Sequence, residues 1–569
     1  MNLSVRAGLS GVAAAGAAVG IAELVAVGTG PLSAPLLAVG GVVVDNVPPA
    51  VKDFGVRVFG VHDKTALITG TAILLAAYAF GLGVVAVRRW RLGLIGIALF
   101  AAIGVAAALT RHDAGPLAAL PSLVGAGVAV VVLHYLLELA DAEITVTGEP
   151  AALRTPTPAL GGATLAGGYD TSGTAVHSAG PTDPTPELGG GRLAAGYDNS
   201  GTDIHRPAPD AYGMMNAGSR RRFLRALGIT AGVALVAGIG GRLLTSRKAV
   251  TKARAAVVLP EPRQTVAPLP SGVQAPGATP FVSSNKDFYR IDTSLYPPQV
   301  DPATWQLRIH GMVRNPITIT WAELLQRPMI ERYVTLTCVS NEVGGDLIGN
   351  ARWLGTPIKE LLDEADPLPG ADQVVQRSVD GWTCGSPTAT LRDGRDALLA
   401  IGMNGEPLPV AHGFPVRMVV PGLYGYVSAC KWITEIELSR FEDFDAYWVP
   451  RGWSQQAPIK TESRIDTPRD GAQRDPGTVV IAGVAWAQHR GISRVEVQVD
   501  DAPWAEATLA TMVTSDTWRQ WSYRWEATEG KHTIRVRATD GSGQTQTSTP
   551  ASPAPNGASG WHSVQVTVG

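Results

Sequence analysis

Two stretches of sequence decide the fold: MNGEPLPVAHGFPVRMVVPGLYGYVSACKW at residues 403–432 and TLTCVSNEVGG at 335–345. In the longer stretch, apolar residues alternate with others, a pattern that predicts a β-strand: Val416, Met418 and Val420. About a hundred residues upstream the same alternation occurs at Trp305, Leu307 and Ile309. We therefore expect the decisive stretches to lie in a domain that contains a β-sheet.

Helical signals lie between these strands. Thr320 begins one at 320–326, and Pro357 begins another at 356–364. Mixed short strands and helices predict an α+β domain over 281–450, preceded by a Pro-rich linker at 246–280.

The last part of the chain, 451–569, has the pattern of an all-β domain. VEVQVD at 495–500, HTIRVRATD at 532–540 and SVQVTV at 563–568 each alternate apolar and polar residues. Short strands in this arrangement predict an immunoglobulin-like β-sandwich.

The composition of the whole chain limits its class. It has 569 residues, of which 17% are charged, and a mean hydropathy of +0.11. These values exclude a wholly disordered chain, a collagen and a disulfide-stapled miniprotein. The formal net charge of -2 gives no general attraction to nucleic acid, so we expect no nucleic-acid partner. The positive hydropathy indicates that part of the chain lies in lipid.

The N-terminal region, 1–138, is predicted to be a helical transmembrane domain. Runs at 65–87 and 92–110 are uncharged, and 114–137 contains His134 but no Asp, Glu, Lys or Arg. Each run can span about 30 Å of hydrocarbon. The region 8–44 predicts one span near 8–28 and then a broken or re-entrant stretch, because Glu23, Pro31 and Pro35 interrupt it. A sixth span near 30–48 stays an alternative.

A further span is predicted at 222–245. The residues SRRRFLR at 219–225 precede it and resemble a twin-arginine export motif, although an ordinary basic cluster at the start of a span is the alternative. The tight turn with Arg88, Arg89 and Arg91 is expected on the cytoplasmic side. Five spans then place the N-terminus inside and residues 245–569 outside, in a multi-pass protein of the cell membrane. Six spans would place the N-terminus outside.

Residues 139–221 are rich in Gly, Pro, Thr and Ser and contain a duplication. PTPALGGATLAGGYDTSGTAVH at 156–177 recurs as PTPELGGGRLAAGYDNSGTDIH at 184–205. Two copies without apolar faces do not make a solenoid, so we expect a disordered cytoplasmic linker.

At Cys338 the sequence resembles a known family. The two decisive stretches and NARWLGTPIKELL at 350–362 resemble the molybdopterin-binding domain of the sulfite oxidase family, and AWAQHRGISRVEVQVD at 485–500 resembles that family's C-terminal dimerisation domain. The resemblance covers about 280–569 and no part of the membrane region. It implies a molybdenum–molybdopterin cofactor (Moco), a sulfite-oxidase-type fold and a possible homodimer.

The resemblance also assigns residues. Cys338 is the expected molybdenum ligand, since a thiolate suits a redox metal whose other sulfur ligands come from a pterin dithiolene. For the cofactor phosphate, the matching positions are His412, Arg417 and Lys431. Hydrogen bonds to the pterin are expected from Asn341 and Ser428.

The substrate side departs from the family. Its F-x-R-x-H motif appears here as Phe288 to Asp292, so Arg290 is kept as a catalytic candidate and the histidine is replaced by Asp292. A second arginine is absent from the stretch that holds Tyr426, our other catalytic candidate, and Cys384 stands where the family has a tyrosine. By Coulomb's law, one cation fewer and one carboxylate more weaken the binding of sulfite. We expect oxygen-atom transfer on a small or protein-borne oxyanion, S-oxide or N-oxide, in either direction.

Several alternatives remain. Cys384 and Cys430 either line the pocket, form a disulfide with each other, or are inert core thiols.

The sequence has no CxxCH motif and no cysteine cluster, so electrons must come from or go to a partner. Haem or quinone binding by the spans stays open. The rival function is a non-catalytic, membrane-anchored binding module that kept the fold and lost the cofactor.

Overall fold

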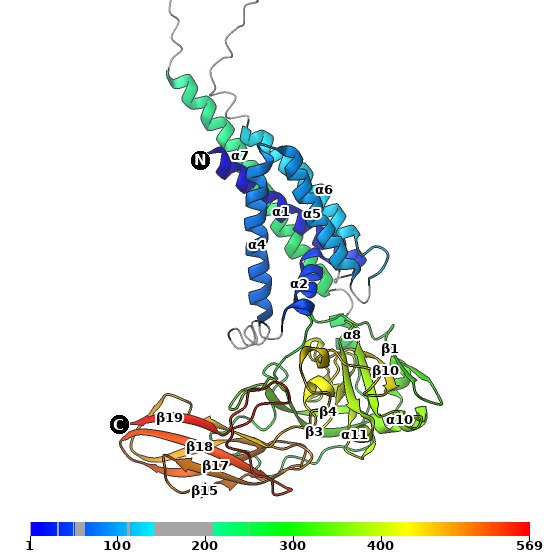
Figure 1. Cartoon of the computed structure of the whole chain (residues 1–569), viewed down its shortest axis with the longest axis vertical. Helices are drawn as coiled ribbons and strands as arrows, with labels where there is room; N and C mark the ends of the chain where they lie inside the picture. Colours follow the sequence, from blue (N-terminus) through cyan, green and yellow to red (C-terminus); the bar gives the residue numbers. More distant parts are fainter. Residues whose placement is uncertain are drawn as a thin grey trace, which may run out of the picture.

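The computed structural model describes residues 2–30, 33–48, 63–110, 114–141, 209–247 and 250–569, besides Val51 and Val58. The duplicated motif of the predicted linker lies outside these residues. Figure 1 shows a helical bundle that stands on a middle domain, with a β-rich C-terminal domain beside it. We use these three names below, with the middle domain covering 250–461 and the C-terminal domain 462–569.

The bundle contains five helices that are long and apolar enough to cross a membrane, counting only residues that the structure describes. Together with the short α2, its helices are α1 (Leu3–Thr29), α2 (Pro35–Asn46), α4 (Asp63–Ala86), α5 (Trp90–Leu109), α6 (Leu120–Asp141) and α7 (Pro209–Arg247). The 12 residues of α2 extend about 18 Å, too short to cross the hydrocarbon core. This short helix lies where the sequence predicts a broken stretch, and the described part of the chain has no sixth long apolar helix.

Small residues let the helices of the bundle approach closely. A Cβ atom at Gly11 of α1 would collide with the carbonyl oxygen of Ala79 in α4, and one at Gly83 would collide with Ala7. Large apolar side chains point outward instead, with Leu74 and Val236 more than 70% exposed. Close backbone contact inside and apolar surface outside are typical of helices packed in lipid.

Two predicted boundaries differ from the structure. Helix α7 begins at Pro209, so the predicted span at 222–245 is part of a longer helix and the linker at 139–221 ends earlier than expected. From residue 250 onward, the predicted linker at 246–280 also belongs to the middle domain. In it, α8 (Val250–Ala256) docks through Arg254, whose Nε donates to the Leu408 carbonyl at 2.8 Å, and Val273 joins the core.

The middle domain is built from two sheets, of which the first is mixed and the second is antiparallel. One has the strand order β2-β1-β10-β5-β6, and the other has the order β3-β4-β7-β8 with β9 paired to β7. The strands are β1 (Gln306–Gly311), β2 (Ile317–Thr320), β3 (Ile330–Thr337), β4 (Ile348–Pro357), β5 (Gln373–Ser378), β6 (Thr383–Pro387), β7 (Leu398–Met403), β8 (Glu406–Pro407), β9 (Arg417–Val419) and β10 (Ile433–Ser439). The helices are α9 (Trp321–Leu325), α10 (Ile358–Ala365) and α11 (Thr388–Arg392). The predicted α+β class is therefore correct.

The C-terminal domain is a two-sheet sandwich. Its sheets have the orders β11-β13-β17-β16 and β12-β19-β18-β14-β15. The strands are β11 (Glu462–Thr467), β12 (Ala472–Arg474), β13 (Gly477–Trp486), β14 (Ile492–Val499), β15 (Ala505–Glu506), β16 (Thr508–Leu509), β17 (Arg519–Ala527), β18 (Gly530–Asp540) and β19 (His562–Val568). Trp521, Ile534 and Val536 are fully buried between the sheets, as an immunoglobulin-like fold requires.

The C-terminal domain holds the end of β3. Gln488 Nε2 donates to the carbonyl oxygen of Thr335 and to Thr337 Oγ1, both at 3.0 Å. The backbone amide of Trp518 donates to Thr335 Oγ1 at 2.8 Å. These bonds fix the strand that leads directly into Cys338.

Candidate active site

Cys338 lies at the first position after β3. Its amide donates to the Leu347 carbonyl at 2.9 Å, and its carbonyl accepts from the Asn341 amide at 3.1 Å, so both sides of its backbone are fixed. Of the three cysteines, Cys338 is 8% exposed, whereas Cys384 and Cys430 are fully buried. Burial raises the pKa of the Cys338 thiol, and the nearby Lys431 opposes this rise. A bound metal would stabilise the thiolate further.

The three residues predicted for the cofactor phosphate converge. Arg417 at the start of β9 and Lys431 face each other across a β-bridge, and His412 ends the 3-10 turn η3 (Val410–His412). Gly413 allows this approach: its φ is 111°, and a Cβ there would lie 2.9 Å from the Cβ of Arg417 and 3.2 Å from that of Lys431. The structure thus brings together residues that are up to 19 positions apart.

Arg417 is a buried cation bonded to carbonyl groups. Its side chain donates to the carbonyls of His412 at 3.2 Å and Met418 at 3.3 Å, and its guanidinium carbon lies 5.1 Å from the Trp353 ring centroid. Burial lowers its pKa to about 10, so it stays charged at neutral pH. Among the described residues, no carboxylate forms an ion pair with it. A buried guanidinium in such surroundings is suited to an anion such as phosphate.

His412 differs from Arg417 and Lys431 in its charge. Burial, with Arg417 and Lys431 nearby, lowers its pKa to about 3, so its ring is neutral at physiological pH. Its Nε2 lies 3.2 Å from the Asn285 carbonyl, which accepts only, so Nε2 carries the hydrogen. His412 therefore contributes a neutral ring to the cluster.

Asp292 links the predicted phosphate and substrate sites. Its Oδ2 lies 2.5 Å from Lys431 Nζ and 3.0 Å from Arg290 Nε. The Asp292 and Lys431 side chains are 7% and 10% exposed, so this is a buried ion pair. Arg290 and Lys431 were predicted for different sites, and the structure joins them at one carboxylate.

Comparisons with known proteins agree with this geometry. Residues 294–448 match the oxidoreductase molybdopterin binding domain, and residues 462–536 match a bacterial Ig domain. Sulfite oxidase of Arabidopsis thaliana is 30% identical over 271 residues, which are 39% of this chain and 68% of the relative. The chain belongs to the sulfite oxidase family.

Other relatives match a smaller share of their length. Sulfite oxidase of Gallus gallus is 30% identical over 276 residues, 40% of this chain and 59% of the relative. The chain spans about half the length of the animal relatives it matches, between 49% and 59%. Among solved structures, the sulfane dehydrogenase SoxCD from Paracoccus pantotrophus is 22% identical to this chain. The match covers 48% of this chain and 75% of the SoxCD chain, with a TM-score of 0.43.

Three predictions from the sequence are confirmed by these comparisons. The chain is a molybdopterin oxidoreductase of the sulfite oxidase family, its cofactor is the molybdenum cofactor, and its C-terminal domain is Ig-like. The homodimer, the sidedness of the bundle and the twin-arginine export route stay predictions.

The donor set at Cys338 fits this cofactor. Within the described residues, no group of three His, Cys, Asp or Glu side chains could hold a bare metal ion. One thiolate beside a cluster of cations suits a metal that brings its own dithiolene sulfurs and an anionic phosphate. Cys338 would hold the metal, and Arg417 with Lys431 would face the charged end of the cofactor.

Tyr289 is a site residue that the sequence analysis missed. Burial raises its pKa above the ordinary range, and Cys338 adds to the rise, whereas Arg417 opposes it. A Cβ placed on Gly425 would lie 3.8 Å from the Tyr289 hydroxyl and 3.8 Å from the carbonyl oxygen of Thr337, the residue before Cys338. The signal was its position between the two motif residues Phe288 and Arg290.

Three other predicted site residues form local bonds. Asn341 Oδ1 accepts from the Leu347 amide at 2.8 Å and closes the loop after Cys338. Ser428 Oγ is fully buried, 2.9 Å from the Tyr424 carbonyl. Tyr426 donates to the Ser454 carbonyl at 2.6 Å. These bonds shape the loops, and the predicted roles toward cofactor and substrate are untested.

Cys384 and Cys430 are free thiols in the core of the middle domain. Burial raises the pKa of Cys430, and a hydrogen bond with Cys384 raises it further. The predicted alternative of a disulfide is therefore not what the structure contains.

Proposed function

We propose that this protein is a membrane-anchored molybdenum oxidoreductase that transfers an oxygen atom to or from an uncharged S-oxide or N-oxide type of substrate, small or protein-borne, rather than to sulfite. The observation that carries the proposal is the carboxylate of Asp292, which pairs with both Arg290 and Lys431. A substrate dianion would meet a cluster whose positive charge is one unit lower than that of the two cations alone.

Electrostatics support the preference for an uncharged substrate. Two unit charges 4 Å apart interact by about 4 kcal/mol near a protein surface. The carboxylate would repel an anion by a comparable amount and so offset the attraction of one cation. An S-oxide or N-oxide carries no net charge and needs a hydrogen-bond donor for its oxygen rather than a cation.

The residues of the chain have separable tasks in this proposal. Cys338 holds the metal, while Arg417 and the neutral His412 position the cofactor. Tyr289 keeps its proton, because its pKa is raised, and so serves as a neutral donor close to Cys338. When bound, the cofactor supplies a metal centre that exchanges one oxygen atom and two electrons with the substrate.

The proposed sidedness places the middle domain outside the cytoplasm. Helix α7 ends at Arg247, just before α8 docks on the middle domain, so Arg221 and Arg222 lie toward the other end of the bundle. This supports cytoplasmic basic residues and an external middle domain. The resemblance of 219–225 to a twin-arginine motif supports export of a folded, cofactor-loaded domain.

The test is a substrate screen on the purified full-length chain from a host that makes the cofactor. We expect about one molybdenum per chain, reduction of S-oxides or N-oxides with a reduced dye or their formation with an oxidised one, and little turnover of sulfite. Faster turnover of sulfite than of every uncharged substrate would overturn the substrate class. Absence of molybdenum would instead favour the non-catalytic binding module.

A further inference from the structure

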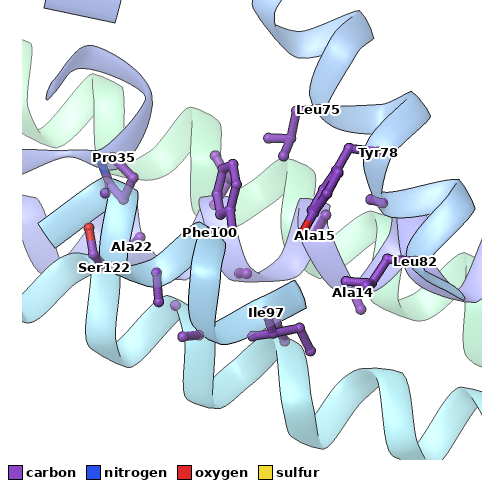
Figure 2. Close-up of a pocket in the computed structure, with 18 of the residues that line it drawn as sticks. Ala14, Ala15, Ala22, Pro35, Leu75, Tyr78, Leu82, Ile97, Phe100 and Ser122 are labelled. Atoms are coloured by element: carbon purple, nitrogen blue, oxygen red, sulfur yellow. The ribbon is translucent and has the colours of Figure 1, made fainter. Parts of the chain in front are cut away.

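A cavity lies inside the helical bundle, between α1, α2, α4, α5 and α6. It contains about 690 Å³ of space between atoms, part of it open to the surroundings, and its walls are mostly Ala, Gly and larger aliphatic residues. Figure 2 shows Ser122 and Pro35 together at one end, with Phe100, Tyr78 and Leu82 farther along. A cavity of this kind takes an apolar molecule.

A second hollow, with about 650 Å³ of space between atoms that is partly open to the surroundings, continues the first toward the outside of the bundle. Both are lined by Pro35, Leu75, Tyr78 and Phe100, and the second also reaches Leu74, which is 73% exposed. The cavity therefore opens toward the surface that would face lipid. A ligand with a long apolar tail can enter there without crossing water.

Two aromatic side chains form a wall of the cavity. The rings of Tyr78 and Phe100 lie 6.2 Å apart with an interplanar angle of 27°. The Tyr78 hydroxyl donates to the Gly96 carbonyl at 3.0 Å and so ties α4 to α5. Such a wall suits the flat face of a conjugated ring.

Ser122 supplies the cavity with a hydrogen-bond donor. The residue is 5% exposed and lines the cavity, and no partner for its Oγ exists among the described residues. A buried hydroxyl without a partner costs free energy, and a ligand carbonyl would remove that cost.

One end of the cavity lies toward the part of the bundle that meets the middle domain. Pro35 lines the cavity at the start of α2, and on the same helix a Cβ at Gly40 would lie 2.7 Å from Leu295 Cδ1. Leu295 is only three residues after Asp292. One short helix therefore connects the cavity wall to the segment that carries the candidate substrate residues.

We propose that this cavity binds an isoprenoid quinone that exchanges electrons with the molybdenum site. The quinone carbonyl accepts from Ser122, the ring lies against Tyr78 and Phe100, and the tail leaves through the second hollow. In the reductive direction, a quinol gives two electrons and two protons and becomes a quinone, while the S-oxide loses its oxygen as water and becomes a sulfide. This electron-transfer role rests on the proposed function, whereas binding of the quinone can be measured without it.

The test uses full-length protein in phosphatidylglycerol nanodiscs and menaquinone-4 as the probe. Ala101 lines the cavity and its neighbour Ala102 on α5 faces outward, so Ala101→Leu and Ala102→Leu add the same volume inside and outside the cavity. We expect Ala101→Leu to weaken binding at least tenfold, Ala102→Leu to bind like the unchanged protein, and Ser122→Ala to lose about fivefold, as for one hydrogen bond. Thermal unfolding checks that each variant folds.

The result is independent of catalysis, because the same titration is made with Cys338→Ser protein. Equal binding by Ala101→Leu and Ala102→Leu would overturn the proposal. So would a phospholipid that native mass spectrometry finds in the chain and that menaquinone-4 does not displace. Binding without electron transfer to the molybdenum site would overturn the role in turnover and leave the substrate class to its own screen.

Discussion

Arg417 and Asp292 mark two sides of the candidate site that treat charge in opposite ways. On one side, Arg417 is a buried cation that donates to backbone carbonyls. On the other, Asp292 is a buried carboxylate that binds both Arg290 and Lys431. The first arrangement leaves positive charge for an anionic cofactor, and the second reduces it on the side where substrate is expected. The difference suits the Arg417 side to cofactor binding and the Asp292 side to substrate selection.

The largest effect should come from Cys338→Ser, because it removes the proposed metal ligand on which both sides depend. We expect turnover to fall by at least a thousandfold, while the thermal unfolding temperature of the middle and C-terminal domains stays nearly unchanged. Cys430→Ser is the matched control, since Cys430 is also a buried thiol but is not the proposed metal ligand. Activity retained in Cys338→Ser would contradict the assignment of the metal ligand.

Arg417→Met tests the cofactor side. A buried cation without an anionic partner is destabilising, so its replacement should raise or maintain the stability of the cofactor-free chain. If Arg417 holds the cofactor phosphate, the molybdenum content of the purified variant should fall about tenfold or more. Metal analysis and thermal unfolding, measured together, separate the two roles.

Arg352→Met is the control for that experiment. Arg352 lies in β4 of the same sheet, and its Nε is 3.6 Å from Glu331 Oε1, with 35% of its side chain exposed. A partly exposed pair of this kind contributes little, so this variant should keep its molybdenum. Equal loss of metal in both variants would mean that any arginine removed from the domain has the same effect.

Asp292→Asn tests the substrate side. Loss of the carboxylate leaves the charges of Arg290 and Lys431 available to an anion, so we expect kcat/KM for sulfite to rise roughly tenfold and that for an uncharged S-oxide to change little. Asp396→Asn, which removes a partly exposed partner of Arg332, should change neither. A lower kcat/KM for both substrates would show that Asp292 acts in folding or cofactor binding.

The elements of the middle domain could largely be predicted from local sequence. Thr320 begins α9 with a complete capping box, as its position before an apolar run predicts. The alternating residues near Trp305 form β1. Composition failed at 246–280, because a Pro-rich segment can still pack: Val273 lies in the core even though its neighbours suggest a linker.

The charges of the site could be predicted, but their pairing could not. Asp292 and Lys431 are 139 positions apart, and no local pattern reveals that the fold brings them within 2.5 Å. Tyr289 was overlooked because one aromatic residue beside a motif is more often part of a core. The neutral state of His412 depends on its burial next to two cations, which appears only in three dimensions.

The smallest expected effect concerns Glu462. Like Asp292, it is a buried carboxylate, but its surroundings differ. It lies at the junction of the middle and C-terminal domains and is 5% exposed; its Oε2 accepts from Gln546 Nε2 at 3.1 Å, while its Oε1 has no hydrogen-bond partner among the described residues. Burial raises its pKa to about 8, against the opposing effect of Lys460.

The sign of the pH dependence follows from this raised pKa. The folded protein holds the Glu462 proton more tightly than the unfolded chain, so the stabilisation is complete below about pH 4.5 and is lost as the pH rises toward 8. The loss is at most about 1.4 kcal/mol per pH unit. Glu462→Gln should therefore unfold at a higher temperature than the unchanged protein at pH 8, with the difference shrinking at pH 5. Asp292→Asn is the control and should not show that gain at pH 8, because the Asp292 carboxylate is paired with two cations. A similar gain in both variants would contradict the difference between the two carboxylates.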